Sequence, residues 1–139
     1  MAIRDYKEYP TIFFWKETEE EDILFFKYAP KLDISIDTAK EIVRSRLEYT
    51  EGKAMYTVID GTNIKSITKE ARDYMNSGGL EGVLGGAFLS NNVVATLVIN
   101  LFLRFSNMSI PARFFTDKKD AINWIRKVKA EKQHFLERI

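Results

Sequence analysis

Lys53-Ala54-Met55-Tyr56-Thr57-Val58-Ile59-Asp60 is the stretch of sequence that decides the fold, because it is an almost unbroken apolar run. Such a run is typical of a central strand that is buried on both faces, and strands of that kind belong to parallel sheets covered by helices. The turn pair Asp60-Gly61 ends the run. We therefore expect the sequence on either side to supply alternating helices and strands.

Two aromatic-rich segments precede this strand, Tyr9 to Lys16 and Asp22 to Tyr28, and both have the composition of β-strands. Only the polar run Glu17 to Glu21 separates them, so the two strands should form an antiparallel hairpin with a solvated acidic turn. Between the hairpin and the central strand, apolar residues recur at helical spacing over Ile36 to Thr50 and predict a helix.

The C-terminal half continues the alternation. The predicted elements are a helix over Thr68 to Ser77, a strand over Gly82 to Ser90, a helix over Val93 to Ser106, a strand over Ala112 to Phe115, and a last helix from a cap at Thr116 or Asp117 to about Arg138. The order ββαβαβαβα predicts an α/β fold with a mixed, mostly parallel five-stranded sheet packed by four helices. We expect a single domain over residues 1–139, with its core at about residues 9–129.

In open sheets of this kind, partners and ligands bind at the loops that leave the carboxyl ends of the strands. Here those loops are Asp60 to Ile67, Ser90 to Asn92, and Thr116 to Asp117. They are the first places to search for a site.

Composition excludes several classes of protein. The net charge of +1 gives no overall field that would attract nucleic acid. The chain has no cysteine, so disulfides and thiolate chemistry are absent and a reducing compartment is expected. The N-terminus lacks a signal peptide's apolar run, and the longest apolar stretch, Val93 to Phe105, is too short for an integral membrane segment. We predict a soluble cytoplasmic protein.

No catalytic, metal or cofactor site is predicted. His134, the only histidine, lies far along the last helix, where it cannot join a triad at the strand ends. A carboxylate magnesium site would need Asp60, Asp117 or Asp120, but an aspartate at a strand end is more commonly a cap. The glycine-containing segments lack a phosphate-binding motif.

The segment Val93 to Phe105 has more apolar surface than a helix lying on a sheet requires. Thr96, Asn100 and Arg104 form one narrow polar stripe, which leaves an apolar arc of about 240° where a little over about 100° is usual. Three interpretations remain open: burial among neighbouring helices, an interface with a partner or a second copy, or the wall of a pocket for an apolar molecule or lipid. The candidate residues for a dimer or apolar-ligand surface are Leu97, Leu101, Phe102, Phe105 and Trp124.

Several segments resemble one family of small stand-alone bacterial proteins. They are Ile64 to Met75, Ile99 to Phe105, Ile110 to Asp117 (Ile-Pro-Ala-Arg-Phe-Phe-Thr-Asp), and Ala121 to Ile125. Those proteins are similar to the STAS fold of anti-sigma-factor antagonists and are also compared with CRAL-TRIO lipid-binding domains. The resemblance implies a non-enzymatic regulatory or protein-interaction domain, and the alternative is a carrier of small apolar ligands or lipids with a pocket lined by Leu97, Leu101, Phe105 and Trp124.

The resemblance also implies a phosphorylation switch. In STAS-type antagonists, a Ser or Thr at the start of the helix after the central strand is phosphorylated, which changes docking. The matching region here is Asp60 to Thr68, with Asp60, Ser66 and Thr68 as the candidate switch or docking residues and Ser66 and Thr68 as the nearest hydroxyls. This sequence departs from the usual Asp-Ser-Ser/Thr-Gly pattern, because residues 62–66 are additional and no glycine follows the hydroxyl. Thr68 is also a candidate N-cap, and the two roles can coexist.

Overall fold

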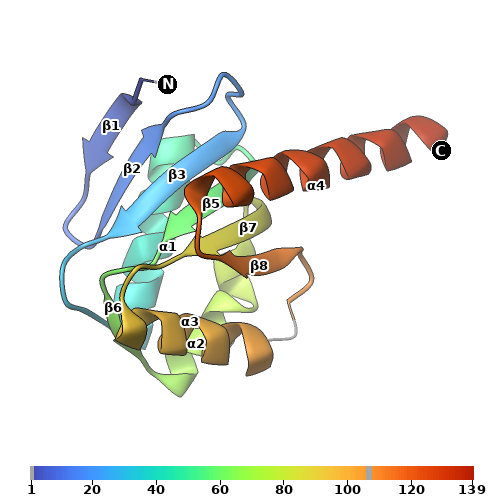
Figure 1. Ribbon diagram of the computed structural model, residues 1–139. Coiled ribbons are helices and arrows are strands. Elements are labelled where there is room, and N and C mark those ends of the chain that lie inside the picture. The colour runs from blue at the N-terminus through green and yellow to red at the C-terminus, as the bar shows by residue number, and fades with distance from the viewer. Residues whose placement is uncertain (1, 106–107) are drawn as a thin grey trace.

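The computed structural model describes residues 2–105 and 108–139, and its centre is a six-stranded sheet (Figure 1). The sheet order is β1-β2-β3-β5-β7-β8. Its first three strands pair antiparallel, and β3, β5, β7 and β8 are parallel. The strands are β1 (Arg4–Glu8), β2 (Ile12–Lys16), β3 (Ile23–Tyr28), β5 (Met55–Asp60), β7 (Val83–Leu89) and β8 (Ala112–Phe115). The predicted mixed, mostly parallel α/β sheet is confirmed.

The strand count differs from the five that we predicted. The edge strand β1 is polar and exposed along nearly its whole length, so it carries no hydrophobic alternation that would reveal it. Two more short strands, β4 (Leu32–Ile34) and β6 (Ile64–Ile67), pair in parallel as a separate two-stranded sheet. These are too short for a pattern of period two to be distinct.

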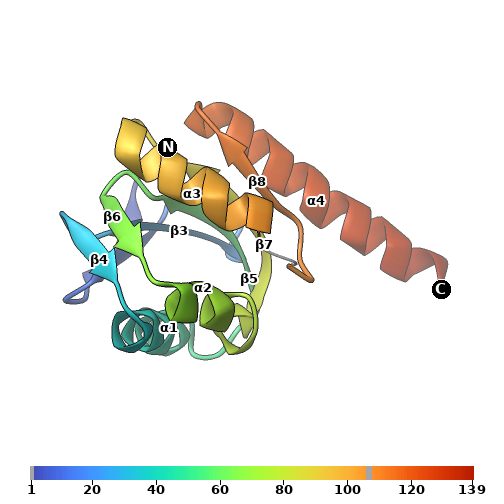
Figure 2. The same cartoon turned by 90° about the horizontal axis from the view of Figure 1, so that it is seen from below.

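Helices cover the two faces of the sheet. The first face carries α1 (Ile36–Thr50), α2 (Lys69–Met75) and α3 (Val93–Phe105), while α4 (Lys118–Arg138) packs on the other (Figure 2). A short 3-10 turn, η1 (Gly78–Leu80), follows α2. None of the helices within the described residues is both long enough and apolar enough to span a membrane.

Strand β3 shows how the sequence builds this two-sided core. Leu24, Phe26 and Tyr28 point to the α1–α3 face, whereas Ile23 and Phe25 point to α4, as the alternation of side chains along a strand requires. All five are buried. Strand β3 is thus buried on both faces, as its apolar sequence indicated.

The acidic turn between β2 and β3 holds α4 in place. We expected this turn to be solvated, but its carboxylates are engaged because the start of α4 passes over it. Arg126 donates to both carboxylate oxygens of Glu20, at 2.7 and 3.0 Å, and Lys129 lies 2.6 Å from Asp22. Lys118 pairs with Glu17. The turn therefore fixes the direction in which α4 leaves the sheet.

Candidate functional site

The loop after β5 is organised by Asp60. Its carboxylate accepts hydrogen bonds from the backbone N–H of Thr62 at 3.0 Å and from the Thr62 hydroxyl at 2.5 Å, and it lies 3.8 Å from Lys27 Nζ. Asp60 is thus engaged in its own turn, as an aspartate that closes a loop is. Gly61 follows, and Ile99 of α3 packs directly against it.

The loops after β5 and β7 meet, as the parallel sheet predicts. The backbone N–H of Asn91 donates to the Thr62 hydroxyl at 3.3 Å. Asn92 then caps α3, because its side-chain oxygen accepts from the N–H of Ala95 at 3.0 Å. The third predicted loop, Thr116 to Asp117, has a structural role, because the side chain of Asp117 accepts a hydrogen bond from the backbone N–H of Lys119 and caps α4. The start of α3 therefore lies beside the Asp60 loop.

The additional residues 62–66 between Gly61 and α2 contribute most of strand β6, which lies beside α3. Ser66 is exposed on this strand and donates from its hydroxyl to Asp33 of β4 at 2.5 Å. Thr68 is the N-cap of α2, where its side-chain oxygen accepts from the N–H of Ala71 at 3.1 Å. Both hydroxyls are on the surface, and each has a structural partner.

Helix α3 has one buried side and one exposed apolar side. Ala95, Ile99 and Phe102 are buried against the sheet. Leu97 is 60% exposed and Leu101 is 49% exposed. We call the exposed set the α3 ridge, and it consists of Val93, Val94, Leu97 and Leu101. Burial among neighbouring helices is therefore not the reason for the wide apolar arc of this helix.

The five residues that we grouped as one apolar surface do not lie together. Leu97 and Leu101 belong to the α3 ridge, whereas Phe102 points inward. Trp124 packs against Phe115 on the α4 face of the sheet, with ring centroids 5.5 Å apart. The side chain of Phe105 lies outside the described part of the chain. Sequence spacing alone could not show that the sheet separates α3 from Trp124.

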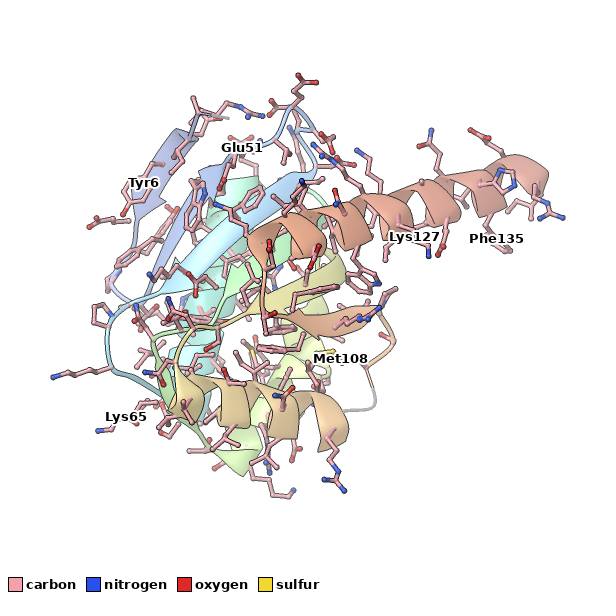
Figure 3. The ribbon with its side chains drawn as sticks, in the orientation of Figure 1. Tyr6, Glu51, Lys65, Met108, Lys127 and Phe135 are labelled. Carbon is pink, nitrogen blue, oxygen red and sulfur yellow. The ribbon has the colours of Figure 1, made fainter. Side chains whose placement is uncertain are left out.

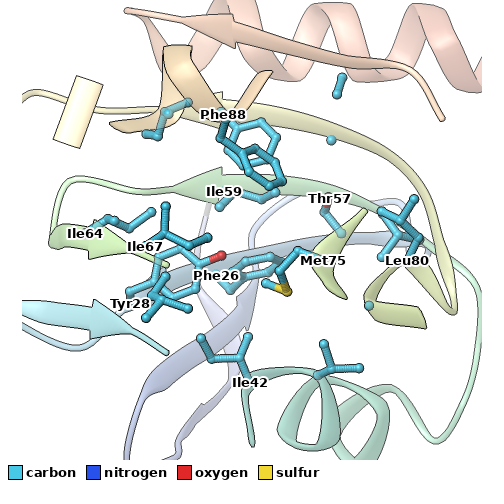
Figure 4. Close-up of a pocket in the computed structure, with 18 of the residues that line it drawn as sticks. Phe26, Tyr28, Ile42, Thr57, Ile59, Ile64, Ile67, Met75, Leu80 and Phe88 are labelled. Atoms are coloured by element: carbon cyan, nitrogen blue, oxygen red, sulfur yellow. The ribbon is translucent and has the colours of Figure 1, made fainter. Parts of the chain in front are cut away.

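An apolar cavity of about 90 Å³ lies between the sheet and helices α1, α2 and α3 (Figure 4). Its walls contradict the sequence-based expectation, because Leu97, Leu101 and Trp124 are not among them. The inward side of α3 contributes instead, together with side chains from the sheet, α1 and the segment before β8. Characteristic lining residues are Phe26, Ile42, Ile59, Val98, Phe102 and Met108.

Three polar side chains stand in this apolar wall, and one of them, Thr57, donates its hydroxyl to the carbonyl of Gly85 at 2.8 Å. Burial raises the pKa of Tyr28 to about 12, so its hydroxyl keeps its proton, and Figure 4 shows that hydroxyl among the lining side chains. Arg46, only 4% exposed, donates to the carbonyls of Glu81 at 2.7 Å and Gly79 at 2.8 Å. Burial also lowers the pKa of this guanidinium from its ordinary value.

Neither Tyr28 nor Arg46 was singled out from the sequence. A signal existed for Arg46, which lies three residues after Val43 and seven after Ala39 and therefore shares the buried stripe of α1. For Tyr28, the alternation along β3 indicated a buried side but gave no reason to expect a cavity.

The structure assembles no metal site from the residues that it describes, since no three histidine or carboxylate side chains lie close enough to share an ion. His134 is exposed on the last part of α4.

Comparisons with known proteins agree with this architecture. A family model described as a domain of unknown function, DUF7793, matches residues 14–129. Among solved structures, the chain is similar to an uncharacterized protein from the DUF3478 family of Shewanella loihica PV-4, whose fold is described as SpoIIAA-like. The identity is 20%, the TM-score is 0.52, and the match covers 90% of this chain and 98% of that chain. No curated protein matches. The predicted STAS-like fold is confirmed, and at this identity the likeness concerns fold alone.

Proposed function

Because the chain belongs to the DUF7793 family, whose description names no activity, we propose its function from the geometry of the α3 ridge. The protein is a non-enzymatic, STAS-like interaction domain of the cytoplasm that acts as one unit over residues 1–139. It docks a protein partner through the ridge and the adjoining Asp60 loop. The observation that carries this proposal is that Leu97 and Leu101 are exposed, although other apolar residues of the same helix already pack into the core.

The ridge has the character of an interface centre. Its aliphatic side chains are contiguous at helical spacing, and polar groups of the Asp60 and Ser90 loops border it as a rim would. Covering the exposed half of a leucine is worth about 1 kcal/mol. Two leucines and two valines therefore supply enough apolar burial to anchor a transient partner.

A matched pair of substitutions tests this docking surface. Leu97→Glu places a charge on the ridge, and Leu136→Glu makes the same change at a similarly exposed position on α4, which is 54% exposed. Chemical cross-linking in cells should capture a partner with the wild type and with Leu136→Glu, and lose it with Leu97→Glu. Equal capture by both variants, with unchanged melting temperatures, would remove the ridge from the proposal.

Ser66 and Thr68 are the proposed control points for docking. Support comes from their exposure and from the position of β6 beside α3. A phosphate on Ser66 would add about −1.5 to −2 charges next to Asp33, so repulsion would replace the present hydrogen bond between β6 and β4. On Thr68, a phosphate would instead lie at the start of a helix, where negative charge is favourable.

Single substitutions test Ser66 and Thr68 separately. If the switch operates, Ser66→Asp or Thr68→Asp changes partner affinity, measured by calorimetry with the captured partner, while the matching alanine variants block phosphate-dependent regulation. If Ser66→Ala and Thr68→Ala leave every partner interaction and its regulation intact, the switch is abandoned.

The second candidate function is binding of a small apolar molecule, and the cavity favours it. A volume of about 90 Å³ lined mostly by apolar side chains could accept part of a small hydrophobic ligand. Tyr28 would donate a hydrogen bond to one neutral acceptor on the ligand. Native mass spectrometry of the gently purified chain tests this candidate. A co-purified mass that disappears in Val98→Phe, which fills the cavity, supports a carrier, and a clean apo mass speaks against it.

A further inference from the structure

The second half of α4 extends beyond the body of the protein (Figures 1 and 2). The helix is 21 residues long, and its first half packs on the sheet through Ala121, Ile122 and Ile125. From residue 130 onward every residue is exposed. About 15 Å of helix therefore projects without support from the described residues, although so short a helical segment is only marginally stable in water by itself.

The buried stripe of α4 continues along the projecting half. Alternate steps of four and three residues connect Ala121, Ile125, Val128, Lys132, Phe135 and Ile139, which is the spacing of a coiled-coil seam. Phe135 is 63% exposed and Ile139 is 86% exposed, and Figure 3 shows Phe135 on the part of the helix beyond the sheet. The seam is thus covered by the sheet at one end and uncovered at the other.

The charges beside the seam favour a second copy of this chain as the partner and an antiparallel orientation of the two helices. In an antiparallel pair of identical helices, Val128 opposes Ile139 of the second copy, and Lys132 opposes Phe135, whose ring accommodates the aliphatic stem of the lysine. Glu131 and Arg138 flank the same side of the seam, so each Glu131 meets the Arg138 of the other copy, and this contact occurs twice across the two-fold axis. A parallel pair would instead place Lys132 against Lys132.

We propose that the projecting half of α4, together with the half-buried Val128 at its base, is a self-association surface, at which two copies of this chain pair antiparallel along Val128, Lys132, Phe135 and Ile139. The α3 ridge is on the opposite face of the sheet and remains free for the partner. The interface comprises about a dozen residues per copy, fewer than the roughly 20–30 of a standard interface. The dimer is accordingly weak and depends on protein concentration.

Sedimentation equilibrium of the full chain, from micromolar to millimolar concentration, tests this proposal. The wild type should dimerise with rising concentration, and Phe135→Glu should weaken dimerisation by about tenfold or more. Leu97→Glu on α3 should leave it unchanged. A wild type that is monomeric throughout, or a dimer lost in Leu97→Glu and kept in Phe135→Glu, would overturn the proposal. The latter outcome would leave the ridge as an interface.

Charge reversal tests the antiparallel arrangement. Glu131→Arg and Arg138→Glu should each weaken the dimer, because each creates two like-charge contacts. An equimolar mixture of the two variants should dimerise again, since every contact across the axis is then between opposite charges. Glu137→Arg on the opposite side of α4 is the control of equal charge change, and it should have no effect. A mixture that stays monomeric, or single variants that dimerise like the wild type, would refute the antiparallel pairing.

Discussion

The contact between Gly61 and α3 makes a quantitative prediction about how the loop after β5 is joined to the helix that carries the ridge. A Cβ atom on Gly61 would lie 2.6 Å from Cδ1 of Ile99 and 3.2 Å from Cδ1 of Ile64. Ile99 is 2% exposed, so its side chain has little room to rotate away. Gly61→Ala should therefore force α3 or the loop to shift.

The magnitude follows from opposing effects. Overpacking a buried site costs about 1–3 kcal/mol, and the loss of glycine's freedom in the unfolded chain offsets about 0.4–1 kcal/mol. A net destabilisation of roughly 1 kcal/mol is expected for Gly61→Ala. Ile99→Val deletes the Cδ1 methyl group that causes the closest contact, and by itself it costs about 1 kcal/mol.

The double variant is the informative one. Without coupling, Gly61→Ala/Ile99→Val should lose about 2 kcal/mol, whereas relief of the contact should limit the loss to about 1 kcal/mol. Urea unfolding of the four proteins measures the coupling energy, with a melting-temperature shift of roughly 4 °C per kcal/mol as a second readout. Additivity within about 0.3 kcal/mol would show that Ile99 does not pack on Gly61 as described.

Three further predictions concern stability. Arg46→Met keeps the apolar stem but leaves two carbonyls of the η1 region without a donor, so urea unfolding should show a loss of about 2 kcal/mol. Thr68→Ala should cost about 1 kcal/mol through loss of the α2 cap, and Thr68→Asp should retain most of the stability because aspartate also caps helices. Hydrogen bonds from Lys16 and Arg4 lower the pKa of Glu21 from 4.5 to about 2. The stabilisation of the folded state by ionised Glu21 is therefore complete above about pH 4.5 and is lost as pH falls toward 2. Between these pH values, the melting temperature of Glu21→Gln should depend less on pH than that of the wild type.

Local patterns in the sequence were sufficient to predict the main elements of the fold. The apolar run at residues 53–60 became the buried strand β5, and the helical spacing of Ala39 and Ile42 placed α1 within its true bounds. Sequence patterns did not predict strand β1, because that strand has no alternation of apolar and polar residues. Sequence patterns also could not show which polar residues form ion pairs in the folded protein. The carboxylates of the acidic turn, for example, bind a helix that lies more than a hundred residues later in the chain.

The candidate site was less predictable because its geometry depends on which side of the sheet each helix covers. A wheel of α3 showed excess apolar surface but could not separate the outward Leu97 from the inward Phe102. It also could not place Trp124 on the opposite face. Burial by the sheet, rather than periodicity within one helix, assigns these side chains to different surfaces.

Helix α3 joins the two functions that we propose for its side of the sheet. Leu97 and Leu101 form its outer ridge, while Val98 and Phe102 line the cavity on its inner side. A partner on the ridge and a molecule in the cavity would therefore contact the same turns of one helix. If the two binding events are coupled, linkage requires each ligand to change the other's affinity by the same factor. Calorimetric titration of the partner into wild type and Val98→Phe would reveal this, because filling the cavity should alter partner affinity although Val98 does not belong to the ridge.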